Sequence, residues 1–272
     1  MAVLDLNLAD VQTWDDEDDV THEVRVLVPD APPVAMPEGT TGLMSEIPPT
    51  DAGEHDTAFA VSIFTATTPA RLSKAFRLAP DGTLEKLPGG NMSAGHVETR
   101  RFDNAGVFAD AIAGMTPAQA LVYGVCGHDV ARVVAAAKIE AAQTASTDGV
   151  PIVTRTREAF SWQAGPGLLM LDYDPPHDND PLTPDALLSV LYQVCPDIET
   201  APHVVRSSAS AHVYHGDRCL RGPRGLRVWV LVADARDIPR AGEGLFQRLW
   251  LAGYGRIAIS KAGSLLVRGL ID

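Results

Sequence analysis

Residues 167–176 read GLLMLDYDPP, and this stretch decides how the second half of the chain is interpreted. Its apolar run from Gly167 to Tyr173 is typical of a strand that is covered on both faces. The prolines at 175 and 176 then stop the strand. Side chains alternate between the two faces of a strand. The carboxylates of Asp172 and Asp174 are therefore expected to point the same way, about 7 Å apart at their roots.

Two carboxylates at that spacing can converge on a pair of divalent cations. Such cations lie about 3.5–4 Å apart in sites that carry out in-line phosphoryl transfer. Hard oxygen ligands suit Mg²⁺ or Mn²⁺. The same D-x-D pattern also occurs as two solvated acids at a strand end before a turn, so the pattern alone leaves both interpretations open.

The segments that follow this strand predict an RRM-like module over residues 166–272. Thr183-Pro184-Asp185 is typical of a helix start, and the apolar positions after it follow helical spacing. Further expected elements are strands over 204–214 and 226–233, a basic loop over 216–225 between them, and a helix from Ile238 that ends near Gly253. Strand, helix, two strands, helix, strand is the order of an RRM-like unit packed as an α/β sandwich.

The preceding residues predict an N-terminal α/β module over 57–165, so that the whole domain, 57–272, is α+β. We expect strands over 58–65 and 97–102, a short helix from Pro69 toward Lys74 and a hairpin around Pro80-Asp81-Gly82. Thr116-Pro117 predicts a brief helix, and residues 130–145 predict an Ala-rich helix.

Charge is distributed very unevenly along the chain. The net charge is −13, yet residues 1–60 alone hold fourteen acids and one base, Arg25. Residues 201–272 carry eleven Lys or Arg against five acids, so the last part of the chain is basic and a nucleic-acid partner is allowed. Residues 1–56 are interpreted as an acidic, largely irregular leader with one short strand over 24–28. The leader charge either shields the basic region or aids solubility.

Several classes of protein are disfavoured by composition. No apolar run is long enough to cross a bilayer, and early acids exclude a secretory signal, which predicts a cytoplasmic protein without a membrane partner. The three cysteines, Cys126, Cys195 and Cys219, are far apart and form no C-x-x-C pair. This spacing argues against a disulfide scaffold or a local zinc finger.

A second polar segment, RSSASAH at residues 206–212, lies on the strand expected over 204–214. On a regular strand, one face would carry its base, two hydroxyls and imidazole: Arg206, Ser208, Ser210 and His212. Such a row can bind the oxygens of a triphosphate. A half-exposed strand with ordinary polar residues outward would show the same pattern.

A third segment closes the chain, SKAGSLLVRGLID at residues 260–272. Lys261 and Arg268 can neutralise a phosphate or a template backbone, and Asp272 can complete an acidic triad. The alternative is a hairpin with ordinary surface charges.

The order of these motifs resembles the archaeo-eukaryotic primase superfamily. More narrowly, it resembles the primase-polymerase domains of replication proteins from phages, prophages and plasmids. The resemblance rests on LDYD at 171–174, then SAH at 210–212, then LLVRGLID at 265–272, and it extends to residues 65–74, 155–162 and 227–254. It covers about residues 58–272 and leaves the acidic leader unmatched.

By position, the resemblance implies that Asp172 and Asp174 bind metal and that Ser210 and His212 contact the phosphates of the incoming nucleotide. The family has a third acidic ligand in a late strand. One alignment places it near Ala258, which cannot ligate, and another offers Asp272, which is our expectation. Arg206, Ser208, Lys261 and Arg268 are the further expected nucleotide-binding residues.

The expected function is template-directed nucleotidyl transfer, as a DNA primase or DNA polymerase with two Mg²⁺ or Mn²⁺ ions. Its partners would be a DNA template and primer, NTP or dNTP substrates, and a helicase domain in a longer protein. The main alternative is a nucleic-acid-binding module of a replication initiator or helicase protein whose active site has decayed. A sugar-nucleotide transferase leaves Ser210 and His212 without a role, and a nicking endonuclease requires a different His and Tyr spacing.

Overall fold

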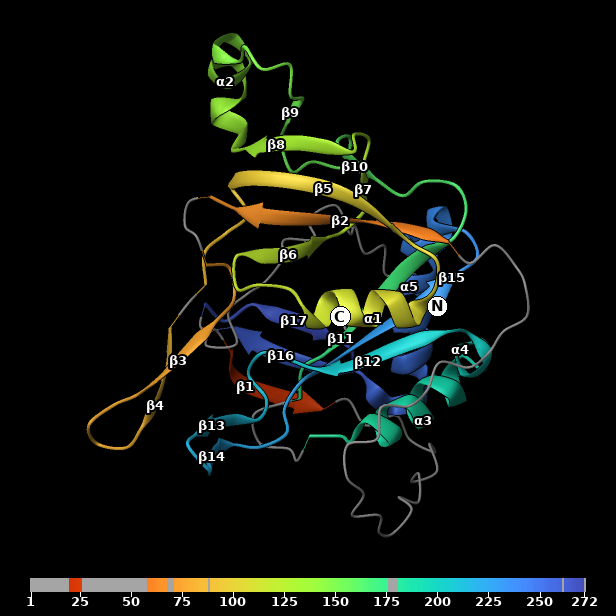
Figure 1. Cartoon of the computed structure of the whole chain (residues 1–272). Coiled ribbons are helices and arrows are strands. Elements are labelled where there is room, and N and C mark those ends of the chain that lie inside the picture. The colour runs from red at the N-terminus through yellow and green to blue at the C-terminus, as the bar shows by residue number, and fades with distance from the viewer. Residues whose placement is uncertain are drawn as a thin grey trace.

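A computed structural model gives the fold of the chain. It describes residues 58–67, 71–87, 89–175, 181–260 and 262–271, together with the backbone of one strand in the leader, β1 (Val20–Arg25). The fold is mixed α+β with several sheets, and the strands form an upper and a lower group in Figure 1. Among the described residues, no helix has both the length and the apolar character needed to span a membrane.

A five-stranded sheet organises the first half of the chain. Its order is β6-β2-β5-β8-β9, and all neighbours are antiparallel except β8 and β9. The strands are β2 (Phe59–Ala66), β5 (Ala94–Phe102), β6 (Gln119–Val122), β8 (Val130–Val134) and β9 (Ile152–Val153). Two ribbons accompany it, β3 (Ala75–Leu78) with β4 (Leu84–Leu87) and β7 (Val125–Cys126) with β10 (Phe160–Ser161). The helical segments are α1 (Ala105–Ala113), η2 (Ala136–Lys138) and α2 (Ile139–Ala145).

Three predicted helices in this half differ from the structure. Residues 130–134 form β8, because Ala131 and Val133 alternate with outward side chains and are buried against β5, so helix α2 begins only at Ile139. Thr116 starts a turn, in which its N–H donates to the side-chain oxygen of Gln119 at 2.9 Å. The helix expected toward Lys74 is absent over 71–74, and residues 68–70 lie outside the described residues.

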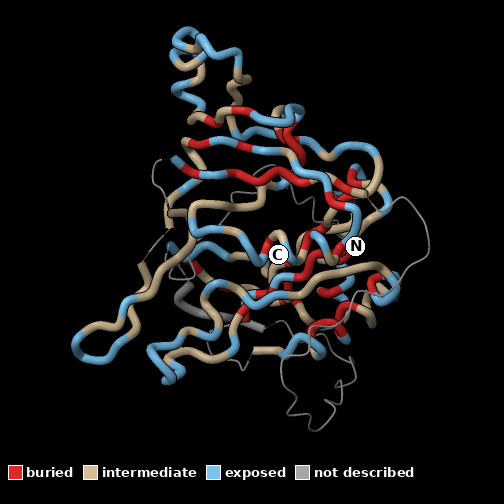
Figure 2. The backbone as a smooth tube through the Cα atoms, viewed as in Figure 1, coloured by how far each residue is buried: buried red, intermediate tan, exposed pale blue. Residues whose placement is uncertain are grey.

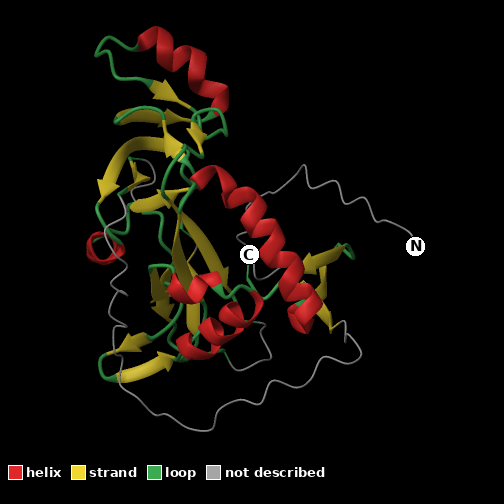
Figure 3. Cartoon of the chain, turned by 90° about the vertical axis from the view of Figure 1, so that its right-hand side faces the viewer, coloured by secondary structure: helices red, strands yellow, loops and turns green. Residues whose placement is uncertain are grey.

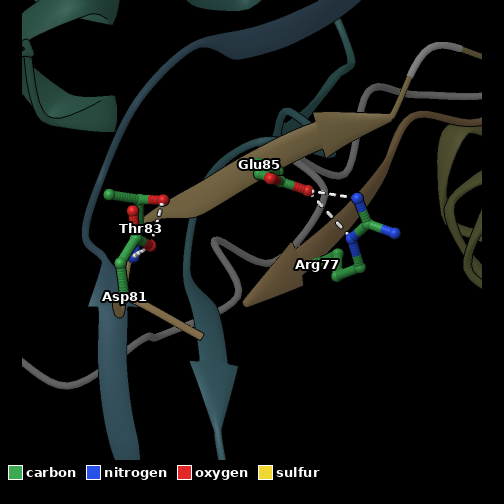
Figure 4. Close-up of polar contacts among 4 residues, drawn as sticks. All are labelled: Arg77, Asp81, Thr83 and Glu85. Atoms are coloured by element: carbon green, nitrogen blue, oxygen red, sulfur yellow. Dashed lines mark hydrogen bonds and ion pairs between the residues drawn. The ribbon is translucent and has the colours of Figure 1, made fainter. Parts of the chain in front are cut away.

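One helix of this half was not predicted, and one hairpin was predicted correctly. Helix α1 is capped by Asn104, whose side chain accepts from the N–H of Val107 at 3.0 Å. The hairpin β3–β4 turns at Gly82, which has a φ of 85°. Polar contacts within this hairpin join Arg77 to Glu85 and Asp81 to Thr83 (Figure 4).

A three-stranded antiparallel sheet organises the second half, in the order β11-β15-β12. Its strands are β11 (Gly167–Tyr173), β12 (His203–Ser207) and β15 (Leu226–Val232). The helical segments are α3 (Pro184–Val194), α4 (Asp197–Thr200), η3 (Ala235–Asp237), α5 (Ile238–Leu249) and the π-helical turn η4 (Trp250–Tyr254). The remaining strands are the hairpin β13 (Val213–His215) with β14 (Arg218–Arg221), then β16 (Arg256–Ser260) and β17 (Leu265–Arg268). The predicted strand at 167–173 and the helix starting at Pro184 are confirmed.

Strand β11 is covered on both faces, as its apolar sequence predicts. Leu169, Leu171 and Tyr173 lie in a core with residues of α3 and α5. Leu168 and Met170 pack on the other face against a cluster that joins the two halves of the chain. In that cluster Trp229 of β15 meets Phe108 of α1 at 5.9 Å between ring centroids, alongside buried residues of β2. Figure 2 shows the buried residues concentrated along the strands of both groups.

The expected RRM-like unit is only partly formed. Its first three strands, β11, β12 and β15, make one sheet, but its last strand, β16, belongs to another sheet with β1 and β17. A strand has two edges for hydrogen bonding, and both edges of β16 are taken by these partners. This small sheet is separated from the other strands by a long helix (Figure 3).

The leader contributes to the fold through strand β1. The predicted strand over 24–28 lies instead at Val20–Arg25, paired antiparallel with β16, and residues 26–28 are outside the described residues. This pairing crosses the boundary expected at residue 56. The rest of the leader before and after β1 is likewise outside the described residues.

A chain that begins at residue 26 is expected to be less stable than one that begins at residue 20. It loses the β1–β16 ladder, which covers five residue pairs. At about 0.5–1.5 kcal/mol net per hydrogen bond, the expected loss is roughly 2–5 kcal/mol. Urea unfolding followed by circular dichroism measures it, and equal free energies of unfolding for the two chains would contradict the pairing.

Candidate nucleotide and metal site

Asp172 lies in a row of charged side chains that crosses the second sheet. The register pairs Asp172 of β11 with Arg227 of β15, and Arg227 with Arg206 of β12. Residues that pair directly in antiparallel strands project from the same face. We call Asp172, Arg227 and Arg206 the first row. It lies on the same face of the sheet as Met170 and Trp229, which pack in the cluster that joins the two halves. Asp172 and Arg227 are each two residues along their strand from these two residues.

A second row lies next to the first, where the strands end. The N–H of Ser208 donates to the carbonyl oxygen of Gly225 at 2.8 Å. A Cβ at position 225 would lie 2.7 Å from Oδ1 of Asp174 and 3.3 Å from Oγ of Ser208. The carboxylate and the hydroxyl therefore both lie next to Gly225, in space that a larger residue would fill. We call Asp174, Gly225 and Ser208 the second row.

Asp172 already has a positively charged partner. Nε of Arg227 is 3.3 Å from Oδ1 of Asp172, and Nη2 is 3.5 Å from Oδ2. The side chain of Arg227 is 46% exposed, and that of Asp172 is 25% exposed. These distances are longer than the 2.7–2.9 Å of a strong charge-assisted bond. An exposed pair of this kind contributes about 0–1 kcal/mol.

Tyr173, between the two acids, points to the opposite face and anchors the loop that follows. Its hydroxyl oxygen accepts the N–H of Leu182 at 2.9 Å, which fixes the start of the segment leading into α3. Burial raises the pKa of the Tyr173 phenol, and the positive charges of Arg256 and Arg224 oppose part of that rise.

The strand predicted over 204–214 ends at Ser207, and this changes the positions of Ser210 and His212. Residues 208–211 form a turn closed by the N–H of Ala211 donating to the carbonyl oxygen of Ser208 at 3.0 Å. The hydroxyls of Ser208 and Ser210 are 3.0 Å apart, so Ser210 joins the second row through Ser208. The expected alternation of four residues on one face is therefore wrong beyond Ser208.

His212 is placed at the start of the β13–β14 hairpin, outside both rows. Its φ of 55° is in the left-handed region, which is uncommon for residues other than glycine. Its N–H donates to the carbonyl oxygen of Gly222 at 2.9 Å, and its side chain is exposed. The chain then continues into β13, which pairs with β14, so part of the basic loop expected over 216–225 is a strand.

The β13–β14 hairpin also contacts the first half of the chain. The guanidinium of Arg221 lies over the ring of Phe76 in β3, 5.4 Å from its centroid. Such a cation–π contact is worth about 0.5–1 kcal/mol at an exposed site. It links two hairpins that come from different halves of the sequence.

The remaining predicted site residues are not brought into the rows by the described structure. Arg268 lies on β17 opposite Arg256, whose guanidinium donates to the carbonyl oxygen of Gly269 at 3.0 Å. Ala258 is 3% exposed in the middle of β16. Lys261 and Asp272 lie outside the described residues.

The donor set fits a hard divalent cation in kind but supplies only part of a coordination shell. Asp172 and Asp174 offer carboxylate oxygens, and the Asp174 carboxylate lies close against the backbone of Gly225. In the described ranges, no three His, Cys, Asp or Glu side chains are grouped closely enough to hold a metal ion. A third protein ligand would have to come from outside those ranges.

Two cavities of the described structure lie away from the two rows. Cavities of about 220 and 280 Å³ are lined by residues of the first half, such as Asn91 and Arg155 in one and Arg101 and His128 in the other. Neither is lined by a residue of the two rows.

Comparison with known proteins finds no match to any family model, to any curated protein or to any solved structure. The resemblance to primase-polymerases therefore rests on the sequence motifs alone.

Two residues of the rows were not expected from the sequence. Arg227 and Gly225 stand at the start of β15, and their partners depend on a register between strands about fifty residues apart. The only sequence signal is the alternation of β15, which puts Arg227 on the same face as Trp229.

Proposed function

We propose that this chain is a template-directed nucleotidyltransferase, a DNA primase or DNA polymerase that acts in the replication of a phage, prophage or plasmid. The observation that supports the proposal most is the second row. It brings Asp174 of the D-x-D strand to the same point above Gly225 as Ser208 of the serine-rich segment. A two-metal phosphoryl-transfer site needs carboxylates to hold its cations, and nearby hydroxyls can donate hydrogen bonds to phosphate oxygens.

The residues divide into two roles in this proposal. Asp172 and Asp174 hold Mg²⁺ or Mn²⁺, with Asp272 as the proposed third ligand. The bound cations would neutralise charge on the α-phosphate and the attacking primer oxygen. Ser208, Ser210 and Arg206 bind the triphosphate oxygens. Lys261, Arg268 and His212 are proposed as further phosphate contacts, although His212 and Arg268 lie outside the two rows and Lys261 lies outside the described residues. Catalysis would consist mainly of positioning and charge neutralisation.

The surroundings of the site agree with a nucleic-acid partner. Arg224, Arg221 and Arg218 follow one another on the segment next to the second row, and residues 201–272 carry a net charge of +6. Phosphate backbones bind such basic surfaces in a salt-dependent way. The proposed partners are a template, a primer and, in a longer protein, a helicase domain, and the proposed compartment is the cytoplasm.

A second function is favoured by one observation. The described residues supply two carboxylates at the site, while the alternative position for a third, Ala258, is a buried alanine. A nucleic-acid-binding module with a decayed active site would have this composition. It would bind single strands without joining nucleotides.

Incubation of the purified chain with a primed DNA template, NTPs or dNTPs and Mn²⁺ tests the proposal. Primer extension, or synthesis on an unprimed template, that stops when EDTA is added is the expected result. Salt-sensitive single-strand binding with no nucleotide incorporation under any of these conditions would instead support the binding module. Strand binding is measured by fluorescence anisotropy on the same samples.

A further inference from the structure

Arg227 occupies a position that neither the D-x-D motif nor the serine-rich segment accounts for. It stands on the central strand β15, with Asp172 on one side and Arg206 on the other. Backbone pairing on both sides fixes its Cα, so only its side chain can move. The guanidinium can therefore exchange between neighbours without any change in the sheet.

The contact between Arg227 and Asp172 is loose. Both N–O distances exceed 3.2 Å, and both side chains reach solvent. The free-energy cost of breaking such a pair is small. A divalent cation carries twice the charge of a guanidinium and binds carboxylate oxygens at shorter range, so it would displace Arg227 from Asp172.

Displacement leaves positive charge without a counter-ion. Arg206 forms no ion pair with any residue in the described ranges, and it directly faces Arg227 across the β12–β15 ladder. Like charges opposite each other in a sheet are destabilising. Once Asp172 binds a cation, two guanidinium groups and the cation together form a site for a polyanion. The hydroxyls of Ser208 and Ser210 lie one row further along the same strands.

We propose that Arg227 is an exchangeable counter-ion: it neutralises Asp172 before the divalent cation binds and then, with Arg206, binds the phosphates of the nucleoside triphosphate. This inference rests on the proposed function. It assigns to Arg227 a nucleotide-binding role and makes cation and nucleotide binding cooperative. By linkage, each ligand raises the affinity of the other by the same factor.

The test uses the full chain with Arg227→Met, which keeps the length of the side chain and removes its charge. Mn²⁺ binding without nucleotide, followed by electron paramagnetic resonance, is expected to tighten about 2–5-fold because the competing guanidinium is gone. The affinity for ATP or dATP at saturating Mn²⁺, measured by calorimetry, is expected to fall about 10-fold or more because a charged contact to phosphate is lost.

Arg240→Met is the matched control. Arg240 is an exposed arginine that also pairs with an aspartate, Asp237, but it lies on α5 away from the two rows. Both affinities should equal those of the unmodified chain. Circular dichroism checks that each variant is folded, and Arg227→Lys, which keeps the charge but cannot form a fork of two bonds, is used if Arg227→Met unfolds. For Arg227→Lys we expect the affinity for ATP or dATP to fall by a smaller factor.

The outcomes separate this inference from the proposed function. Tighter Mn²⁺ binding together with weaker nucleotide binding supports the exchange. Mn²⁺ binding that depends on Asp172 but is unchanged or weaker without Arg227 overturns the exchange and leaves the proposed function intact. Mn²⁺ binding that is the same in the unmodified chain and in Asp172→Ala overturns the metal site, and with it both proposals.

Discussion

Replacement of Asp172 and Asp174 together by alanine is expected to abolish nucleotide incorporation, with a loss of at least about 1000-fold. The two carboxylates are the only acidic side chains that the described structure places in the two rows. Without them the rows contain no carboxylate to hold the cations. Bound cations stabilise the charge of the transition state by several kcal/mol in metal-dependent sites. Initial rates of primer extension with Mn²⁺ measure the effect.

The double variant should remain folded, which makes its loss of activity informative. Asp172 gives up one loose pair with Arg227, and Arg227 stays solvated, so the free energy of unfolding should change by about 1 kcal/mol or less. The control is Asp110→Ala with Asp185→Ala, two exposed aspartates on α1 and α3 that remove the same total charge. Extension by the double variant at more than a tenth of the normal rate would remove these carboxylates from the mechanism.

Replacement of Gly225 by alanine is expected to reduce incorporation about 10–100-fold and to cost about 1–3 kcal/mol of stability. The new Cβ would lie 2.7 Å from the carbonyl oxygen of Tyr173, as well as 2.7 Å from Oδ1 of Asp174. The carbonyl belongs to the backbone of β11 and cannot rotate away. Either the two strands separate locally or Asp174 moves, and in both cases the second row is displaced.

Gly222→Ala is the matched control for this prediction. Gly222 is in the same segment, and a Cβ there would have no atom within 4 Å. Its substitution should leave both the rate of incorporation and the free energy of unfolding unchanged within about 0.5 kcal/mol. A Gly225→Ala chain with normal activity would show that the positions of Asp174 and Ser208 beside Gly225 are not needed for incorporation.

Local sequence patterns determined the elements that carry the site. The apolar run of β11 is buried on both faces, and the Thr183 side chain caps α3 by accepting from the N–H of Ala186 at 3.2 Å. The strand at β15 and the helix at α5 also follow their predicted spans closely. These features depend on the periodicity and capping of a few neighbouring residues, so they can be read without knowledge of distant contacts.

Local patterns failed where two segments compete for the same residues. The residues at 208–212 alternate in a way that fits a strand, yet the turn at Ser208 and the left-handed His212 break it. Likewise residues 130–134 fit a helix by composition, but pairing with β5 makes them a strand. At 130–134 the pairing with the distant strand β5 outweighed a weak local preference, whereas at 208–212 a local turn and bonds to the loop residues Gly222 and Gly225 ended the strand.

The sequence by itself determined which faces of its strands are apolar. It also determined that Asp172 and Asp174 project from the same face of their strand. Only the tertiary structure decided what lies opposite: Arg227 beside Asp172, Gly225 beneath Asp174, and β1 of the leader against β16. The physical reason is that strand register is set by the packing of segments far apart in the chain. A shift by one residue would be equally compatible with each strand alone, and it would turn Arg227 away from Asp172.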